Sequence, residues 1–381
     1  MPSNLLPAIV LAGPPHCGKS VLSYLLTMGL RDLGIDHYLL RAAPDGEGDW
    51  YLKGEFAKVH PIRLGHKGKF TPSFVAYMIN RTARRRVPLL VDIGGAPRDD
   101  QWEILSACSH SVLLYQTDDD LQYWRSRLAE LNLLPVVELI SDLHGTDQIL
   151  SLHPVLHGKI SGLDREHHHT GRVFEALLER MAWICRYERT VLEAQHFQGA
   201  EHAILNERAL AQDIGKAVTE KLPYWNPEDL PAALAHLPLE PTAIYGRGPV
   251  WLAAALSVQT LPASCQLFDV HYGWLVVPEI RNAISDDAKV QTTELPGTTA
   301  QLLEFEITNQ LLEPQDVISL PLAEGSGGVI LSGKLPRWLF AGLARAYAVK
   351  RPWVAVHDLG RGRKVVVFST TDRPALGETL D

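Results

Sequence analysis

The chain has few cysteines, no surplus of positive charge and no long apolar run. Its 381 residues contain 4 cysteines, which are widely spaced and form no C-x-x-C pair. They predict neither a disulfide framework nor a cysteine-based metal site, and they indicate a reducing, cytoplasmic environment. The four residues are Cys17, Cys108, Cys185 and Cys265.

The charge balance makes one large class of partner unexpected. Lysine and arginine number 36 against 44 aspartates and glutamates, which gives a formal net charge of −8. Proteins that bind long nucleic acids usually carry a basic surplus, so we expect a small ligand or a short oligonucleotide and no duplex nucleic acid. No run approaches the ~18 uninterrupted apolar residues of a membrane span, so no membrane partner is expected. The apolar run 5–12 leads directly into a glycine loop, which predicts a strand rather than a signal peptide.

The length predicts two or three domains, because a chain of this size exceeds one ordinary core. The first part alternates apolar runs with helical patterns, which is typical of a parallel sheet with crossover helices. The predicted strands are 8–12, 37–41, 89–93, 111–115 and 136–140, and the predicted helices are 19–33, 72–86, 98–108 and 119–131. Residues 151–165 read as a loop or hairpin, 173–198 and 206–221 as helix, and the proline-rich segment 223–241 as a linker.

Residues 13–20 read Gly-Pro-Pro-His-Cys-Gly-Lys-Ser and match the phosphate-loop pattern G-x-x-x-x-G-K-[ST] between a predicted strand and a predicted helix. In such a loop, backbone N–H groups surround the phosphates at a helix N-terminus. Lys19 is expected to reach the β- and γ-phosphates, and the Ser20 hydroxyl to hold magnesium. We therefore predict ATP and Mg²⁺ as cofactors. The predicted nucleotide-binding residues are Gly13, His16, Cys17, Gly18, Lys19, Ser20 and Asp92, with Ser20 and Asp92 at the metal.

Asp92 follows a buried apolar strand, as expected of a carboxylate that orients the magnesium shell, although a helix-capping aspartate near a turn would look similar. Arg125 and Arg127 could clamp a γ-phosphate or form a solvated helix face. Asp45 and Glu47 follow the second strand, where substrates bind in open α/β sheets, but a solvated turn is an equal alternative.

Two further charged runs favour structural interpretations. The arginines at 81, 84, 85 and 86 end a predicted helix, where positive charge suits the helix dipole better than it indicates an anion site. The histidines at 167–169 lack the spacing of zinc ligands and read as a polar loop.

The C-terminal part contains an internal repeat. Residues 244–252 and 331–339 each read as a strand, a glycine turn, a proline and an apolar helix. Each helix is followed by an apolar strand that ends in aspartate, Asp269 or Asp358, and then by a valine-rich strand. The second copy also has an opening strand at 302–307 with clear alternation, and no counterpart is evident before the first copy. Two copies of one unit predict a pseudo-symmetric pair.

This ordered set of motifs resembles a small CRISPR-associated family, the Csx-three proteins. The matching segments are 246–252 (GRGPVWL), 303–307 (LEFEI), 328–333 (GVILSG) and 352–358 (PWVAVHD). The resemblance implies a ferredoxin-like domain that assembles as dimers and larger stacks and degrades cyclic tetra-adenylate, the second messenger of type III CRISPR systems, with Mn²⁺. Fusions of such a domain to a P-loop ATPase are known in the family, and this chain looks like one.

The resemblance also implies a set of site residues. The ligand-binding loop corresponds to Gly246, Arg247, Gly248 and Pro249 in the first copy and to Gly333 and Lys334 in the second. The catalytic positions correspond to Asp269, Asp358, His271 and Arg361, with Asp358 at the metal. The histidines that precede this strand in the family have no counterpart here, so the binding loop is better preserved than the metal site.

The expected fold class is α/β: an N-terminal P-loop NTPase parallel sheet followed by tandem ferredoxin-like α+β units. The predicted domains are 1–150, a helical extension and linker over 151–235, a first repeat over 236–298 that lacks its opening strand, and a second over 299–381. The predicted function is degradation of cyclic oligoadenylate, assisted or gated by ATP, in a homo-oligomer. One alternative is a non-catalytic binding module that controls the ATPase, and another is a small-molecule or nucleotide kinase. Because neither copy has the full family set, we predict one composite site in which Asp269 and Asp358 share a metal.

Overall fold

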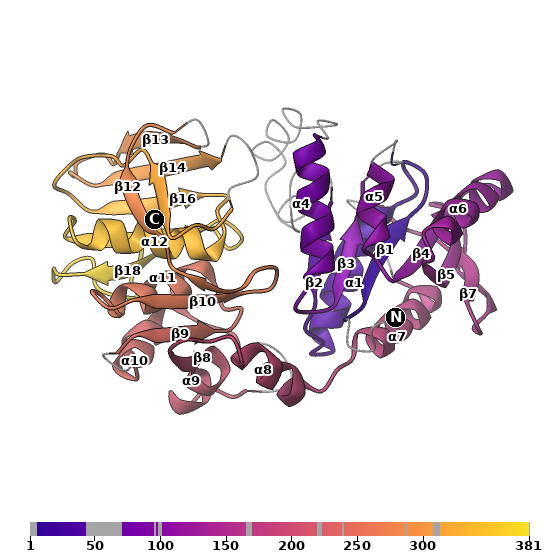
Figure 1. Ribbon diagram of the computed structural model, residues 1–381, viewed down its shortest axis with the longest axis horizontal. Coiled ribbons are helices and arrows are strands. Elements are labelled where there is room, and N and C mark those ends of the chain that lie inside the picture. Colours follow the sequence, from indigo (N-terminus) through magenta and orange to yellow (C-terminus); the bar gives the residue numbers. More distant parts are fainter. Residues whose placement is uncertain are drawn as a thin grey trace. The chain divides into compact units, whose positions relative to one another are not determined.

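The structure of the chain is a computed structural model that describes residues 6–42, 71–94, 97, 101–164, 170–218, 223–237, 240–285, 288–307 and 313–380. It is a mixed α/β protein with parallel-rich sheets, which agrees with the α/β class predicted from the sequence. The chain forms two compact units, Met1–Arg189 and Thr190–Asp381. Figure 1 follows their elements in chain order from indigo to yellow.

The first unit contains a seven-stranded sheet in the order β2-β3-β1-β4-β5-β7-β6. Every neighbouring pair is parallel except the β6–β7 hairpin. The strands are β1 (Ala8–Ala12), β2 (Tyr38–Arg41), β3 (Leu89–Asp92), β4 (His110–Tyr115), β5 (Leu134–Ser141), β6 (Gln148–Ser151) and β7 (Leu156–Ile160). The five strands predicted from apolar runs are confirmed to within two residues at each end. The hairpin that was one alternative for 151–165 lies at 148–160 and extends this sheet.

Helices pack on the sheet of the first unit, and their caps explain where they begin and end. They are α1 (Lys19–Asp32), α4 (Pro72–Ala83), α5 (Gln101–Ser106), α6 (Asp118–Glu130) and α7 (Arg172–Cys185). Thr71 caps α4 through its side chain and Pro72 takes the first helical position. Thr117 and Asp120 form a reciprocal capping box on α6. Apolar side chains of α1 and α7 share one core with strands β1, β4, β5 and β7.

Two helix predictions were too long. The helix predicted over 173–198 is broken at Arg186, whose ψ of 134° is extended, so that α7 and α8 (Arg189–Phe197) are separate. The helix predicted over 206–221 is α9 (Glu207–Asp213), which ends before Gly215, a glycine with a φ of +80°. In both places the apolar pattern continues past a backbone break that the spacing of apolar residues does not reveal.

The second unit contains the two repeats. The first has a four-stranded sheet in the order β11-β10-β9-β8. Its elements are β8 (Ala203–Asn206), β9 (Thr242–Tyr245), α11 (Val250–Gln259), β10 (Cys265–Asp269) and β11 (Gly273–Val276). Between β8 and β9 lie α9, the short 3-10 helix η1 (Pro227–Asp229) and α10 (Leu230–Ala235).

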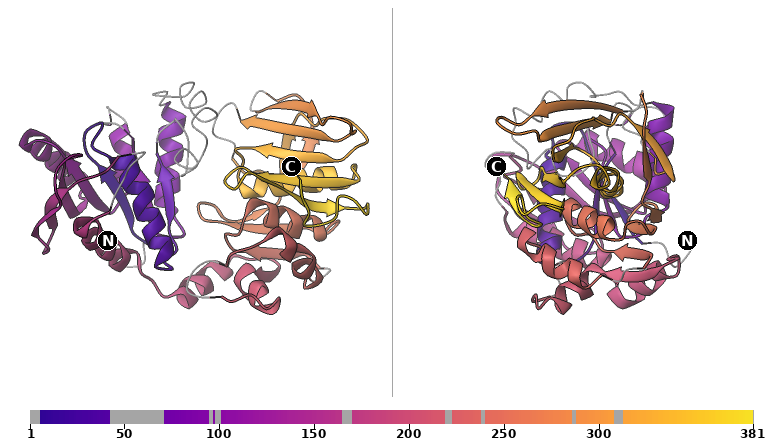
Figure 2. Two further views of the ribbon diagram at one scale, coloured as in Figure 1. Left: turned by 180° about the vertical axis from the view of Figure 1, so that it is seen from behind. Right: turned by 90° about the vertical axis from the view of Figure 1, so that its left-hand side faces the viewer.

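The second repeat has a six-stranded sheet in the order β13-β14-β16-β17-β18-β19. Its elements are β13 (Ala288–Glu294), β14 (Gln301–Ile307), β16 (Val329–Gly333), α12 (Arg337–Ala348), β17 (Trp353–Asp358), β18 (Arg363–Ser369) and β19 (Thr379–Leu380). The strands β12 (Glu279–Asn282) and β15 (Val317–Leu320) form a separate parallel pair. Figure 2 shows both sheets from behind and from the side.

The opening strand that the sequence did not reveal in the first repeat is β8. It pairs in parallel with β9, as β14 pairs in parallel with β16 in the second repeat. The α9–α10 insertion separates β8 from β9 in the sequence. The helices α11 and α12 pack against each other, and both repeats contribute side chains to one apolar core. In the part of the chain that the structure describes, no helix is both long enough and apolar enough to cross a membrane.

Candidate functional site

The glycine loop, residues 13–20, connects β1 to α1 at the carboxyl edge of the first sheet. Strand β1 lies between β3 and β4, so the direction of the crossovers reverses here, and open α/β sheets bind ligands at such a switch point. Gly13 has a φ of +134°, and a Cβ there would collide with the carbonyl oxygen of Leu114. Gly18 has a φ of +84° directly before α1. The motif glycines are therefore required by the backbone path of the loop.

Lys19 is folded back onto this loop. Its Nζ donates to the carbonyl oxygens of Gly13 at 2.7 Å and Pro14 at 2.6 Å, and the residue is 5% exposed. Burial lowers the pKa of the Lys19 ammonium, while the nearby Cys17 and Asp92 oppose that shift. Burial has the opposite effect on the Cys17 thiol, because it raises the pKa of that group. The thiol donates to the Pro14 carbonyl oxygen at 2.9 Å. Lys19 thus lies within the loop that it is expected to complete.

Ser20 and Asp92 lie close together, and the side chain that joins them is Arg41. The Nη1 of Arg41 donates to Oδ2 of Asp92 at 2.6 Å and to Oγ of Ser20 at 3.2 Å. Asp92 is 2% exposed, and its other carboxylate oxygen accepts from the backbone N–H of Gly94 at 3.0 Å. No sequence motif indicates Arg41, although its place at the end of β2, next to β3, predicts that it lies near Asp92.

The donors at this position fit magnesium. A serine hydroxyl and a carboxylate are hard oxygen ligands, and Mg²⁺ in nucleotide sites takes most of its other ligands from phosphates and water. Among the residues that the structure describes, no group of three or more histidine, cysteine, aspartate or glutamate side chains is placed to hold a metal ion. Ser20 and Asp92 would supply two oxygen ligands of such an ion, and phosphates and water would supply the others.

Arg125 and Arg127 make structural contacts. Arg125 pairs with Glu138, with Nε and Oε1 2.9 Å apart. Arg127 pairs with Glu130 at 2.7 Å and lies 4.8 Å from the ring centroid of Trp102. These contacts favour the helix-face alternative over a γ-phosphate clamp.

Two arginines of the run at the end of α4, Arg81 and Arg85, also make contacts within the protein. Arg81 lies 4.6 Å from the ring centroid of Tyr77. Arg85 donates to the carbonyl oxygens of Thr82 at 2.7 Å and Ala107 at 3.1 Å. The carboxylates of Asp45 and Glu47 and the histidines at 167–169 lie outside the described residues.

The glycine-arginine-glycine loop of the first repeat surrounds an internal carboxylate. The side chain of Glu207, at the start of α9, accepts a hydrogen bond from the backbone N–H of Gly248 at 2.6 Å. Its other oxygen pairs with Arg337 of the second repeat, which also donates to the Gly246 carbonyl. A Cβ at Gly246, where φ is +153°, would collide with Glu207. The loop binds an anion in this structure, and that anion belongs to the protein.

Aromatic side chains fill the carboxyl edge of the first repeat. Tyr245 at the end of β9 and Phe268 near the end of β10 lie with ring centroids 4.9 Å apart. His196 stacks on Phe268 at 4.4 Å and bonds through Nδ1 to the Tyr245 hydroxyl at 2.8 Å. Trp274 packs edge-on against Phe268 at 5.4 Å. This edge is therefore filled by packed rings, and the indole N–H of Trp274 also donates to the His196 carbonyl oxygen at 2.7 Å.

Asp269 and His271 serve a turn in the first repeat. The Oδ1 of Asp269 accepts from the backbone N–H groups of His271 at 2.8 Å and Tyr272 at 3.2 Å, which closes the β10–β11 connection. His271 is buried. The contacts of Asp269 agree with the turn alternative, while a metal shared with Asp358 stays a prediction.

The second repeat has polar groups at the equivalent edge. Ser332 corresponds to Tyr245 and His357 to Phe268, and the Ser332 Oγ and His357 Nδ1 atoms are 3.0 Å apart. Asp358 follows directly at the end of β17 and is half-buried. The sequence pattern does not indicate His357, because it lies in an apolar strand that ends in aspartate.

The Ser332–His357 pair belongs to a polar row that crosses four strands. Glu304 of β14 is in register with Ser332, and Lys364 of β18 is in register with His357. The apolar residues two positions before Ser332 and His357 form a small cluster separate from the core beneath α12. Because side chains alternate along strands, the row lies on the face of the sheet that α12 does not cover.

The remaining predicted residues of the second repeat lie around this edge. Gly333 ends β16 with a φ of +140°, and the exposed Lys334 follows it toward the start of α12. Arg361 lies 4.4 Å from the ring centroid of Tyr224 and 3.5 Å from the carbonyl oxygen of Trp225. The structure brings Ser332, Gly333 and His357 together, while Arg361 packs on the segment before η1.

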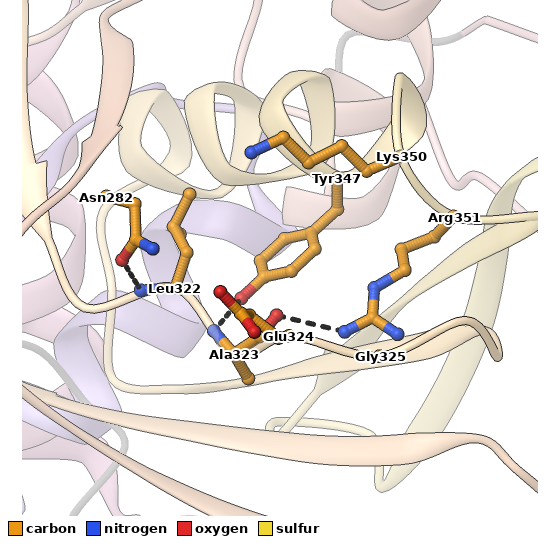
Figure 3. A pocket seen from close by; sticks show the side chains of 8 residues that line it. All are labelled: Asn282, Leu322, Ala323, Glu324, Gly325, Tyr347, Lys350 and Arg351. Carbon is orange, nitrogen blue, oxygen red and sulfur yellow. Dashed lines mark hydrogen bonds between the residues drawn. The ribbon is translucent and has the colours of Figure 1, made fainter.

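A separate pocket of about 250 Å³ lies at the opposite, amino-terminal ends of β16 and β17. Its polar groups hold the segment that precedes β16, as Figure 3 shows: the Tyr347 hydroxyl accepts from the Ala323 N–H at 2.9 Å, and Arg351 donates to the Ala323 carbonyl at 2.9 Å. Asn282 accepts from the Leu322 N–H at 2.8 Å. These contacts give the pocket a structural role.

Residues 305–381 match the family described as CRISPR-associated protein (Cas_csx3). The match supports a CRISPR-associated Csx3 domain at the C-terminal end and a CRISPR-associated function for the chain. It contains Ser332, His357 and Asp358, and it begins after β8–β11 of the first repeat. No curated protein matches the chain.

Proposed function

We propose that this CRISPR-associated protein cleaves cyclic oligoadenylate at its second repeat and that its first unit is a P-loop domain that binds a nucleoside triphosphate with Mg²⁺. The observation that carries the proposal is the Ser332–His357 pair beside Asp358, at a strand edge inside the segment that matches the Csx3 family. In this interpretation the second unit is a tandem of ferredoxin-like repeats, and the second has Ser332 and His357 where the first has Tyr245 and Phe268.

The first unit supports nucleotide binding through its loop. The loop follows a central parallel strand, leads into α1 and carries Lys19 and Ser20 at the first two positions of the helix. Helix N-termini attract phosphate because their first N–H groups lack partners and the dipole is positive there. Mg²⁺ held by Ser20 and Asp92 would neutralise phosphate charge. ATP is the expected nucleotide.

At the second repeat, His357 can accept the proton that a phosphodiester cleavage releases. Ser332 fixes the orientation of the imidazole through Nδ1, and histidine side chains exchange protons near neutral pH. A ribose 2′-hydroxyl of the ring attacks the adjacent phosphorus, its proton passes to His357, and the P–O5′ bond breaks. The products carry a 2′,3′-cyclic phosphate and a 5′-hydroxyl, which takes up a proton. The geometric requirement is alignment of the attacking and leaving oxygens, which binding of the ring would supply.

Two cations of the second repeat would stabilise charge in this reaction. Lys364 is in register with His357, and Lys334 is exposed beside Gly333. Ammonium groups near phosphodiester oxygens form charge-assisted hydrogen bonds. If Mn²⁺ binds, it would polarise the phosphate, and Asp358 is the half-buried carboxylate at this edge that would hold it.

The first repeat then has a supporting role. Its glycine loop already holds Glu207, and its strand edge is filled by Tyr245, Phe268 and His196. A cyclic oligoadenylate that bound this loop would have to displace a buried carboxylate from its N–H partner. The binding-module alternative also agrees with this observation, because a repeat without catalytic groups can still position the second repeat.

Product analysis tests the proposal. The full chain is incubated with cyclic tetra-adenylate, with and without ATP, and linear products are separated by chromatography. We expect linear products that depend on Asp358; products that survive in Asp269→Asn would exclude the predicted shared metal, which requires both carboxylates. Intact ring bound by the protein would instead support the binding module. Transfer of label from γ-labelled ATP to a small molecule would support the kinase alternative.

A further inference from the structure

The metal position of the glycine loop contains a protein cation. The guanidinium of Arg41 lies between the Ser20 hydroxyl and the Asp92 carboxylate, and a single nitrogen, Nη1, donates to both. A guanidinium that bridges these two oxygens and a magnesium ion bound to both of them would compete for the same lone pairs.

The Arg41 contact is buried and directed. The side chains of Arg41 and Asp92 are 7% and 2% exposed. Buried carboxylates require a positive partner, because desolvation without one is costly. Arg41 is the last residue of β2, and its backbone is in register with Asp92 on β3, so the pairing follows from the sheet itself.

Lys19 has a parallel arrangement. Its Nζ donates to two carbonyl oxygens of the loop that is expected to bind the phosphates. Both cations are therefore bound by protein groups in this structure. A Mg²⁺–nucleotide complex must therefore displace Lys19 from the loop carbonyl oxygens and Arg41 from the oxygens of Ser20 and Asp92.

We propose that Arg41 is an exchangeable cation that occupies the magnesium position in the nucleotide-free protein and is displaced when Mg²⁺ enters with the nucleotide. The exchange neutralises Asp92 in both states, so the carboxylate is never buried alone. Part of the binding free energy of Mg²⁺ is used to displace Arg41. Mg²⁺ therefore increases the nucleotide affinity less than it would in a site without such a cation. This inference rests on the proposed nucleotide binding.

The test compares ATP affinity with Mg²⁺ and with EDTA, by calorimetry on the full chain, in wild type, Arg41→Gln and Arg41→Lys. The dissociation constant of ATP in EDTA, divided by the dissociation constant in Mg²⁺, measures the coupling between metal and nucleotide. We expect Arg41→Gln to raise this ratio about tenfold or more, because Mg²⁺ no longer displaces a cation and ATP without Mg²⁺ meets an unneutralised Asp92. Arg41→Lys keeps the charge and should lie between the two.

Arg125→Gln is the matched control, because it removes another arginine that pairs with a buried carboxylate of the same unit, Glu138, away from the glycine loop. Its ratio should equal that of wild type. A second measurement uses Mg²⁺ alone: millimolar Mg²⁺ should raise the melting temperature of Arg41→Gln more than that of wild type or of Arg41→Lys.

The outcomes separate this inference from the proposed function. If wild type fails to bind ATP, the proposed nucleotide binding is wrong and the inference falls with it. If wild type binds ATP but Arg41→Gln weakens binding equally with Mg²⁺ and with EDTA, Arg41 is a phosphate ligand or a structural residue, and the exchange is wrong. An unchanged ratio in Arg41→Gln, or a ratio raised equally in Arg125→Gln, also overturns it.

Discussion

Replacement of Glu207 by glutamine should destabilise the second unit far more than replacement of an exposed glutamate. Glu207 is 2% exposed, accepts from the Gly248 N–H and pairs with Arg337, which ties the loop of the first repeat to α12 of the second. Glu279 is the matched control, because it pairs with Arg281 at 3.4 Å with both side chains more than 60% exposed. The two substitutions remove the same charge in different surroundings.

The magnitude follows from the partners. Removal of one member of a buried ion pair costs about 3–5 kcal/mol, and an unsatisfied buried N–H about 1–3 kcal/mol. The Arg337 side chain is 22% exposed, so water recovers part of its loss. Glutamine also keeps one oxygen for the Gly248 N–H. We therefore expect Glu207→Gln to lower the free energy of unfolding by about 2–3 kcal/mol and Glu279→Gln by less than about 1 kcal/mol.

Urea denaturation of the full chain measures the difference, with hydrogen exchange of peptides from 240–260 to assign the transition to the second unit. The exchange measurement is needed because two compact units need not unfold in one step. Equal destabilisation by the two substitutions, or faster exchange confined to the first unit after Glu207→Gln, would refute the reasoning about the buried carboxylate.

Two further predictions concern the first unit and the cysteines. Lys19→Ala should abolish binding of Mg²⁺–ATP in calorimetry, whereas Lys159→Ala, which removes a surface partner of Asp142, should not; unchanged affinity in Lys19→Ala would exclude the loop as the phosphate site. The native protein should react slowly with a thiol reagent, because all cysteines are buried and burial raises the pKa of both Cys108 and Cys185 to about 12. A raised thiol pKa lowers the thiolate fraction, so little reaction is expected at pH 8 and the full complement of 4 only after denaturation; rapid native labelling at that pH would contradict it.

The sequence predicted what depends on local pattern. The strand before the glycine loop, the glycines of the loop and the helix that starts at Lys19 all follow from neighbours in the chain, and the structure places them as expected. The repeat in the second unit was also visible, because β9–α11–β10 and β16–α12–β17 keep the same order and similar spacing.

The sequence did not reveal what depends on distant partners. Arg41 meets Asp92 across a separation of 51 residues, and Glu207 meets Gly248 across 41. Strand β8 has four residues without clear alternation, and an insertion separates it from β9, so pattern alone could not identify it. His357 lies in a strand whose other residues, apart from Asp358, are apolar. Its register with Ser332 and Lys364, which the structure gives, is what indicates a polar site at His357.

The most direct test of the central claim is the rate of cyclic tetra-adenylate cleavage by His357→Gln compared with His202→Gln. His202 is the matched control, because it also bonds to a serine hydroxyl, that of Ser264 at 2.8 Å, in the same unit but outside the segment that matches the Csx3 family. Proton transfer by a positioned side chain contributes about 10²–10⁴-fold, so the rate should fall by about that factor in His357→Gln and stay near that of wild type in His202→Gln. A wild-type rate in His357→Gln, with ring binding intact, would contradict the assignment of the chemistry to the second repeat.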